Sequence, residues 1–267
     1  MNILICGDVV GSSGREVIEN EVPKLKIKEL LDFVIVNGEN AANGFGITEK
    51  ICKQFYSLGV DVITTGNHVW DQKEIIGYIE NDKRLLRPIN FSSDSPGNGY
   101  GIFSMNNGTH IVVINLICRL FMDLYDDPFR SIESILFKLN NRFEKTVIIV
   151  DVHGEATSEK MALGHYLDGK VAAVVGTHTH IPTADSHILE KGTFYQTDLG
   201  MCGDYNSIVG MEKNKSLFRF LHKHKKNRLE PASGNATLCG VMLKIDEKTQ
   251  KVSSFKPLKI GGILGNK

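Results

Sequence analysis

The segment "VVGTHTHIPTAD" places two histidines, His178 and His180, directly after a run of small apolar residues. In an extended chain, residues two apart point to the same side. We therefore expect the two imidazoles to converge on one point at the end of a buried strand. Because imidazole nitrogens are common metal ligands, this pair suggests a metal site.

Side chains of related chemistry follow several other apolar runs. Taken alone, each has an ordinary explanation, because an Asp or Asn after a strand is often a turn or cap residue and a single His is often packed in a core. Their joint occurrence after separate strands predicts one cluster together with the histidine pair. These residues are Asp8, Glu39, Asn40, Asn67, His68 and His153. The remaining histidines lack this setting, and we expect them to lie outside the cluster: His110, His165, His187, His222 and His224.

The candidate ligands are carboxylate and amide oxygens and imidazole nitrogens, without a thiolate. Such a set suits Mn, Fe, Zn or Ni better than copper. There are more candidates than one tetrahedral ion uses, whereas two ions that share a carboxylate would use them well. The pattern therefore predicts a pair of divalent metal ions.

The elements that must position these residues are short runs rich in Val and Ile, which fit strands buried on both faces. Helix-sized polar stretches lie between them, such as "TEKICKQFYSLG", with Thr48 as N-cap and Gly59 as stop. This alternation predicts an α/β sheet sandwich with its ligand site outside the carboxyl ends of the strands. Residues 92–108 should form a loop and then a hairpin, and residues 237–260 two antiparallel strands at a sheet edge. The strand runs are "NILICGD", "FVIVNGEN", "VDVITTGNH", "THIVVINL", "TVIIVDVHGE" and "VAAVVGTHTH".

Length and composition narrow the class of protein. The 267 residues with 42% hydrophobic content predict a single domain, residues 1–267. Basic and acidic residues number 31 each, so we expect no stable binding to nucleic acid or to an anionic membrane. Five scattered cysteines and the lack of a long apolar run predict a reduced protein in the cytoplasm. The basic segment "LFRFLHKHKKN" (residues 217–227) predicts a solvated surface helix.

These motifs resemble a known family. The chain carries "GD" at Asp8, "GEN" at Glu39 and Asn40, "GNH" at Asn67 and His68, then His153, then "GTHTH" at His178 and His180, in the order of calcineurin-like metallophosphoesterases. Longer stretches resemble the bacterial YmdB-type subfamily over nearly the whole chain. They include "VNGENAANGFGIT", "TTGNHVWDQKEI", "DVHGEATSEKMALGHYLDGKVAAVVGTHTHIPTAD" and "YQTDLGMCGDYNSIVG".

The resemblance implies a four-layer α/β/β/α sandwich with a binuclear site that holds iron or manganese, with zinc as a further candidate. It implies hydrolysis of phosphodiesters, with 2′,3′-cyclic nucleotides as the substrate class, and it suggests self-association. Asp8, Glu39 and His180 would hold the first metal, with Asn40 nearby. The second metal would be held by Glu39, Asn67, His153 and His178, with Glu39 as the bridge.

Four positions depart from the pattern that the resemblance sets. Val10 stands where the superfamily has a histidine ligand, and Glu39 where a bridging Asp is usual. Cys118 stands where relatives tend to carry glycine, and Gly154 where they tend to carry alanine. We expect the last two to affect packing around the site more than its chemistry.

A hydroxide that bridges the two metals is the expected nucleophile, and His68 the expected acid for the departing ribose oxygen. A charge-stabilising role without proton transfer is the alternative for His68. The alternative for the whole protein is a metal-loaded nucleotide sensor or regulatory protein with little turnover. A phosphomonoesterase or phosphoprotein phosphatase is a third reading, and Val10 and the lack of an evident basic groove argue against large substrates. Sequence assigns no substrate-binding residue: Arg119 could contact a substrate phosphate, with a structural role as the alternative.

Overall fold

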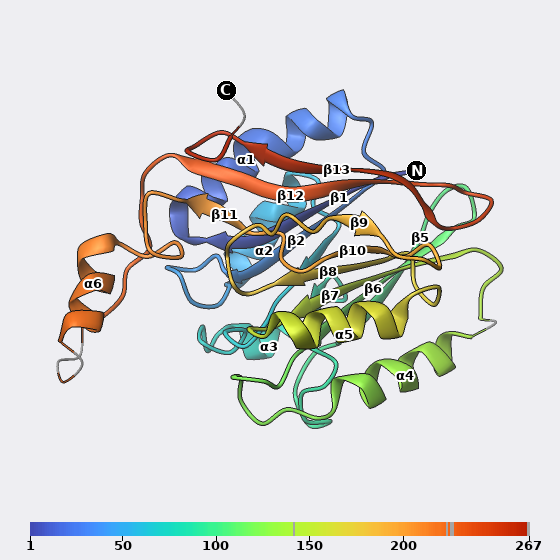
Figure 1. Cartoon of the computed structure of the whole chain (residues 1–267), viewed down its shortest axis with the longest axis horizontal. Coiled ribbons are helices and arrows are strands. Elements are labelled where there is room, and N and C mark those ends of the chain that lie inside the picture. Colours follow the sequence, from blue (N-terminus) through green and yellow to red (C-terminus); the bar gives the residue numbers. More distant parts are fainter. Residues whose placement is uncertain (141, 223, 225–226, 266–267) are drawn as a thin grey trace.

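Two β-sheets stack face to face, and helices cover their outer faces (Figure 1). The structure is a computed structural model that describes residues 1–140, 142–222, 224 and 227–265. It confirms the α/β sandwich expected from the alternation of strands and helices.

The first sheet has the strand order β13-β12-β11-β1-β2-β3-β4. Its parallel centre is β1, β2 and β3, and the antiparallel pair β12 and β13 forms one edge, as expected for the tail. Strand β1 pairs with β12 from Asn2 to Cys6 and then with β11 at Asp8 and Val9, so it changes partner next to a candidate ligand. The strands are β1 (Asn2–Val10), β2 (Phe33–Asn40), β3 (Val62–Thr64), β4 (Leu85–Leu86), β11 (Met201–Asp204), β12 (Ala236–Ile245) and β13 (Val252–Ile260).

The second sheet has the order β5-β6-β7-β8-β10-β9. Strands β6, β7 and β8 run parallel, and β5 joins β6 in the expected hairpin. The strands are β5 (Tyr100–Ser104), β6 (His110–Ile117), β7 (Thr146–His153), β8 (Ala173–Thr177), β9 (His187–Ile188) and β10 (Phe194–Gln196).

The helices follow the strands that they cover. Helix α2 begins where sequence predicted, because the Thr48 side chain accepts a hydrogen bond from the Ile51 amide, and it ends before Gly59, which has φ 92°. The helices are α1 (Gly11–Lys28), α2 (Glu49–Ser57), α3 (Ile75–Ile79), α4 (Pro128–Leu139), α5 (Thr157–Leu167) and α6 (Lys213–Leu221).

Apolar side chains fill three layers between these elements. Along β1, Leu4 and Cys6 face helices α1 to α3, whereas Ile3 and Ile5 face the second sheet. A third layer packs the second sheet against α4 and α5. Three core layers between four structural layers make an α/β/β/α sandwich, because each sheet buries both faces.

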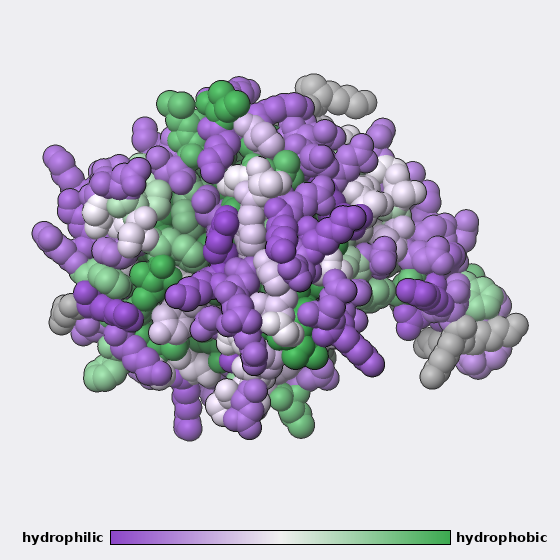
Figure 2. Space-filling model, turned by 180° about the vertical axis from the view of Figure 1, so that it is seen from behind, coloured by the Kyte–Doolittle hydropathy of each residue, from purple (hydrophilic) through white to green (hydrophobic). Residues whose placement is uncertain are grey.

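Helix α6 stands off from the sandwich and forms a lobe at the side of the molecule (Figures 1 and 2). Its exposed Leu217, Phe220 and Leu221 agree with the expected surface helix as far as Leu221. Residues 223, 225 and 226 of the same predicted segment lie outside the described residues. Among the helices of the described ranges, none is both long and apolar enough to span a bilayer.

Candidate metal centre

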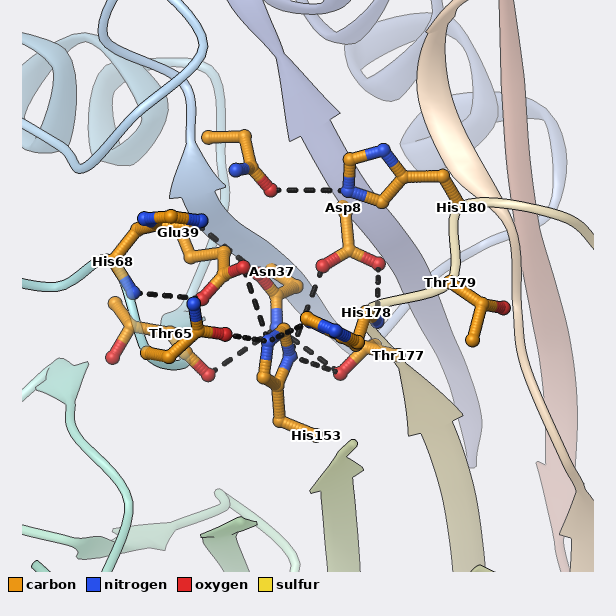
Figure 3. A network of polar contacts seen from close by, with 12 residues as sticks. Asp8, Asn37, Glu39, Thr65, His68, His153, Thr177, His178, Thr179 and His180 are labelled. Atoms are coloured by element: carbon orange, nitrogen blue, oxygen red, sulfur yellow. Dashed lines mark hydrogen bonds and ion pairs between the residues drawn. The ribbon is translucent and has the colours of Figure 1, made fainter. Parts of the chain in front are cut away.

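The predicted residues gather at the carboxyl ends of the parallel strands of both sheets (Figure 3). Asp8 lies near the end of β1, Glu39 and Asn40 end β2, and His153 ends β7. Asn67 and His68 lie in the turn after β3, and His178 and His180 in the turn after β8. Parallel strands bring their carboxyl ends to one edge, so residues far apart in the sequence meet there.

One group, here named the Glu39 half, consists of Glu39, Asn67, His153 and His178. His153 Nε2 lies 3.0 Å from Glu39 Oε1, 3.1 Å from Asn67 Oδ1 and 3.0 Å from His178 Nδ1. The ligand atoms of Glu39, His153 and His178 all lie within 4.8 Å of one another. Four potential metal-ligand atoms thus face a single small volume.

The second group, the Asp8 half, consists of Asp8, Asn40 and His180. His180 Nε2 lies 3.2 Å from Asn40 Oδ1, and its Nδ1 lies 2.8 Å from the carbonyl of Val209. Asp8 Oδ2 accepts a hydrogen bond from the His178 amide at 3.0 Å. Its other oxygen, Oδ1, is buried without a hydrogen-bond partner among the described residues and lies 3.8 Å from His153 Nδ1.

The prediction that His178 and His180 point to the same side of an extended strand is wrong. Strand β8 ends at Thr177, and His178 and His180 have φ angles of 99° and 67°, in a region that L residues rarely adopt. The two rings do not share the face of a strand. His178 turns toward His153 and Glu155, whereas His180 turns toward Asn40, so the turn serves both halves.

A buried ion pair fixes this turn from behind. Asp198 accepts hydrogen bonds from the amide and the hydroxyl of Thr179, and its carboxylate lies 2.8 Å from Lys160 Nζ. Lys160 Nζ also donates to the Thr177 carbonyl at 2.7 Å. Since Lys160 and Asp198 are both fully buried, these charge-assisted bonds hold the unusual backbone in place.

His68 lies at the open side of the Glu39 half. Its amide donates to Glu39 Oε2 at 3.3 Å, and its Nδ1 lies 2.9 Å from Asp71 Oδ2. The ring of Phe45 packs against the edge of the imidazole, with 5.1 Å between centroids. Because Asp71 engages Nδ1, the ring has a defined orientation with Nε2 directed elsewhere.

The donor set fits divalent cations. The contacts around His153 Nε2 bring together a carboxylate oxygen, an amide oxygen and a second ring nitrogen, and the buried Asp8 Oδ1 lacks a partner in the described part of the chain. A Cβ atom on Gly66 would lie 2.0 Å from Glu39 Oε2 and 2.3 Å from the His153 ring. The space is therefore kept free by glycine, and oxygen and nitrogen lone pairs point into it.

In the metal-free protein, the pKa values of Asp8 and Glu39 are shifted in opposite directions. Burial raises the pKa of Asp8 to about 6, despite the opposing charges of His180 and His153. Burial also acts on Glu39, but its contact with His153 and the nearby His68 and His178 lower its pKa to about 2. For His178, burial and the charge of His153 lower the pKa to about 3. A neutral His178 keeps its lone pair available to a metal.

Other polar residues of the site were not identified from sequence. Asp71 follows His68 by three positions, which is the only local signal for it. Asn37 and Asp151 are buried polar residues inside apolar strand runs, "FVIVNGEN" and "TVIIVDVHGE", and this irregularity could have marked them. Sequence did anticipate that the other histidines lie elsewhere, as with His110, which stacks on Phe143, and the exposed His187.

The departures at Cys118 and Gly154 form one packing unit. A Cβ atom on Gly154 would lie 2.3 Å from Cys118 Cβ and 2.6 Å from its Sγ. A side chain at position 154 is therefore incompatible with the present cysteine. The Cys118 amide also donates to the His153 carbonyl at 2.8 Å, so this pair supports the backbone of a candidate ligand.

Comparison with known proteins identifies the family of the chain. The family model for YmdB-like protein matches residues 4–258. The chain belongs to the YmdB-like family. It is 46% identical to the 2′,3′-cyclic-nucleotide 2′-phosphodiesterase of Bacillus subtilis strain 168 over 263 residues, which is 97% of each chain.

Solved structures of similar proteins share the fold. A crystal structure of a hypothetical protein from Thermus thermophilus has a TM-score of 0.91 and 37% identity, covering 98% of this chain and 100% of that one. The crystal structure of a protein described as a novel phosphatase from Mycoplasma pneumoniae has a TM-score of 0.90 and 34% identity, covering 98% and 93%. The four-layer metallophosphoesterase sandwich is thus the fold of this YmdB-like chain.

Proposed function

We propose that the chain is a metal-dependent phosphodiesterase that hydrolyses 2′,3′-cyclic nucleotides. The observation that carries this proposal is the convergence of Glu39, His153 and His178. Beside them lies the buried Asp8 Oδ1, which has no hydrogen-bond partner among the described residues. The name of the 46% identical Bacillus subtilis relative supports the substrate class.

The protein groups have separate roles in this proposal. Glu39, Asn67, His153 and His178 would hold one cation, and Asp8, Glu39 and His180, with Asn40 nearby, the other. Bound divalent ions, iron or manganese by family resemblance, would make water a nucleophile near neutral pH and draw charge from the phosphoryl oxygens. Gly66 keeps the space between the ligands open, and the Lys160–Asp198 pair holds the turn that carries two of the histidines.

His68 is the proposed acid for the departing ribose oxygen. Asp71 holds its Nδ1 and would stabilise the imidazolium, which leaves Nε2 to face the substrate. The imidazole is about a third exposed, with a side-chain exposure of 30%, so a small substrate can reach it while its backbone stays bonded to Glu39. The neutral net charge suits a small nucleotide better than a polymer with many phosphates.

The test is hydrolysis of 2′,3′-cyclic AMP with added Mn²⁺ by wild type, Glu39→Gln and His68→Ala, with His187→Ala as a matched histidine control. We expect Glu39→Gln to lower turnover roughly 10³-fold, and His68→Ala to lower kcat by about 10²- to 10⁴-fold while the nucleotide still binds. His187→Ala should behave as wild type, because His187 is exposed and bonds to its own loop. Elemental analysis of protein purified without chelator should find two metal atoms per chain.

Unchanged turnover in Glu39→Gln would rule out this mechanism. A wild-type protein that binds metal and nucleotide without cleaving would instead identify a metal-loaded sensor or regulatory protein.

A further inference from the structure

A second layer of buried polar residues lies beneath the Glu39 half. Asp151, on β7, is only 3% exposed and sits between the two sheets. Its carboxylate accepts hydrogen bonds from Thr64 on β3, Asn37 on β2 and Thr177 at the end of β8. All three donors are neutral, and they come from both sheets. Such a costly buried carboxylate calls for a reason beyond packing.

The contacts of Thr177 define a direction for its proton. Thr177 Oγ1 lies 2.7 Å from Asp151 Oδ1 and 2.9 Å from His153 Nδ1. An ionised carboxylate only accepts hydrogen bonds, so the single hydroxyl proton of Thr177 points to Asp151. The hydroxyl oxygen then accepts a hydrogen bond from His153, which places a hydrogen on Nδ1.

This tautomer has a consequence for the other ring nitrogen. A metal-bound imidazole is neutral, so with a hydrogen held on Nδ1 it is Nε2 of His153 that presents its lone pair to a cation. Nε2 is the atom that faces Glu39 Oε1, Asn67 Oδ1 and His178 Nδ1 at 3.0 to 3.1 Å. Four lone pairs then face one another, an arrangement that a cation makes favourable.

A branch of the same network reaches Glu39. Asn37 Nδ2 donates to Asp151 Oδ2 at 3.1 Å, and Asn37 Oδ1 accepts a hydrogen bond from the Glu39 amide at 3.1 Å. Figure 3 shows Asn37, Glu39 and Thr177 gathered around the His153 ring. Asp151 therefore connects to two candidate ligands on different sheets.

We propose that Asp151 and Thr177 are positioning residues of the metal centre: Asp151 orients the Thr177 hydroxyl, which fixes the tautomer and ring orientation of His153. Asp151 also positions the Glu39 backbone through Asn37. This inference rests on the proposed function, since it assigns these residues to the proposed metal site. Outer carboxylates that act on ligand histidines typically change metal affinity by about 10- to 100-fold when removed.

The test compares Thr177→Val, which removes the hydroxyl at nearly constant shape, with Thr177→Ser, which keeps it. Thr193→Val is the matched control, because Thr193, directly before β10, is a fully buried threonine whose hydroxyl bonds only to backbone groups in the described chain. Mn²⁺ affinity is measured by calorimetric titration of metal-free protein, and thermal unfolding reports folding. We expect Thr177→Val to lose about 10- to 100-fold in affinity, Thr177→Ser less than about threefold, and Thr193→Val nothing.

A spectroscopic measurement reads the tautomer without metal or substrate. In ¹⁵N-histidine-labelled protein at high pH, the ¹⁵N shifts of His153, assigned with His153→Ala, should report a protonated Nδ1 in wild type and Thr177→Ser. They should report a mixture or a protonated Nε2 in Thr177→Val.

Wild-type affinity in Thr177→Val, or equal losses in Thr177→Val and Thr177→Ser, would overturn the inference while the proposed metal site stands. A wild-type chain that takes up no Mn²⁺ would overturn the proposed metal site itself.

Discussion

The Glu39 half and the Asp8 half of the candidate site differ in how far the protein assembles them by its own contacts. In the Glu39 half, His153 lies within 3.0 to 3.1 Å of its three partners. In the Asp8 half, His180 contacts Asn40 at 3.2 Å, while Asp8 Oδ1 has no hydrogen-bond partner within the described ranges.

The difference has a structural origin. Glu39 and His153 lie at the ends of β2 and β7, whose backbones are fixed by sheet hydrogen bonds on both sides. His180 belongs to a turn with left-handed backbone that depends on side chains such as Asp198. His178 lies in the same turn, but its ring is also held by His153 at 3.0 Å. Rigid strands place ligands accurately, whereas a buried carboxylate oxygen without a partner, such as Asp8 Oδ1, gains one when a cation binds. One half is thus preorganised, and the other depends more on its metal.

The largest expected effect is the loss of metal binding, and it distinguishes the two halves. Glu39→Gln should remove both Mn²⁺ binding events and lower phosphodiesterase activity roughly 10³-fold, because bound metal contributes several kcal/mol to the transition state. Asp8→Asn should remove only the weaker event. Calorimetric titration of metal-free protein measures both. Retention of the weaker event in Glu39→Gln would show that Glu39 is not shared between the halves.

A glycine substitution tests the preorganised half next. Gly66→Ala would place a methyl group 2.0 Å from Glu39 Oε2, so the ligands must move apart. Because a displacement of about 1 Å can cost roughly 10²-fold in rate, we expect a loss of about that size in kcat/KM. Gly77→Ala in α3 is the control, since its Cβ meets nothing within 4 Å. Equal activity of Gly66→Ala and Gly77→Ala would show that the ligands do not need the space beside Gly66.

The two carboxylates should affect metal-free stability with opposite signs. Removing the charge of Asp8, whose pKa burial raises to about 6, should stabilise the metal-free fold, whereas Glu39→Gln should destabilise it. Each effect is on the order of 2–3 kcal/mol at pH 8, or roughly 5 °C in Tm. Thermal unfolding in chelator measures both, and changes of the same sign would remove the contrast between the halves.

The pH dependence sharpens this contrast. Because the pKa of Asp8 in the folded protein lies above its ordinary value of 3.8, its contribution favours folding at low pH and is lost as pH rises through about 6. Glu39, with a pKa lowered from 4.5 to about 2, contributes stability above its ordinary value, and this is lost as pH falls toward about 2. The Tm gain of Asp8→Asn should therefore vanish near about pH 4 and be complete above about pH 7. A Tm gain that does not vary with pH would show that the loss of the Asp8 charge is not its cause.

The smallest effect concerns packing behind the Glu39 half. Gly154→Ala should destabilise the protein by about 1–3 kcal/mol, since its methyl group would overlap Cys118. Combining it with Cys118→Gly should recover most of that loss. A double-mutant cycle by thermal unfolding gives the coupling, and additive effects would show that the two positions are independent.

Much of the candidate site followed from local patterns. Short runs of Val and Ile predicted β1, β2, β3, β6, β7 and β8, and the polar residues at their ends marked Asp8, Glu39 and His153. The strand predictions succeeded because strand formation and burial leave their signature within a few neighbouring residues. The number of layers and the ligand assignment came from family resemblance instead.

Sequence by itself determined which residue types stand at the strand ends and the order in which they occur. Only the tertiary structure decided their division into two halves, the left-handed turn that directs His178 and His180 apart, and the contacts of Asp151 with Thr64 and Asn37 on the other sheet. The physical reason is that these contacts join residues distant in the chain, which meet only when the two sheets stack. A carboxylate within an apolar run shows no partner until the facing sheet supplies one.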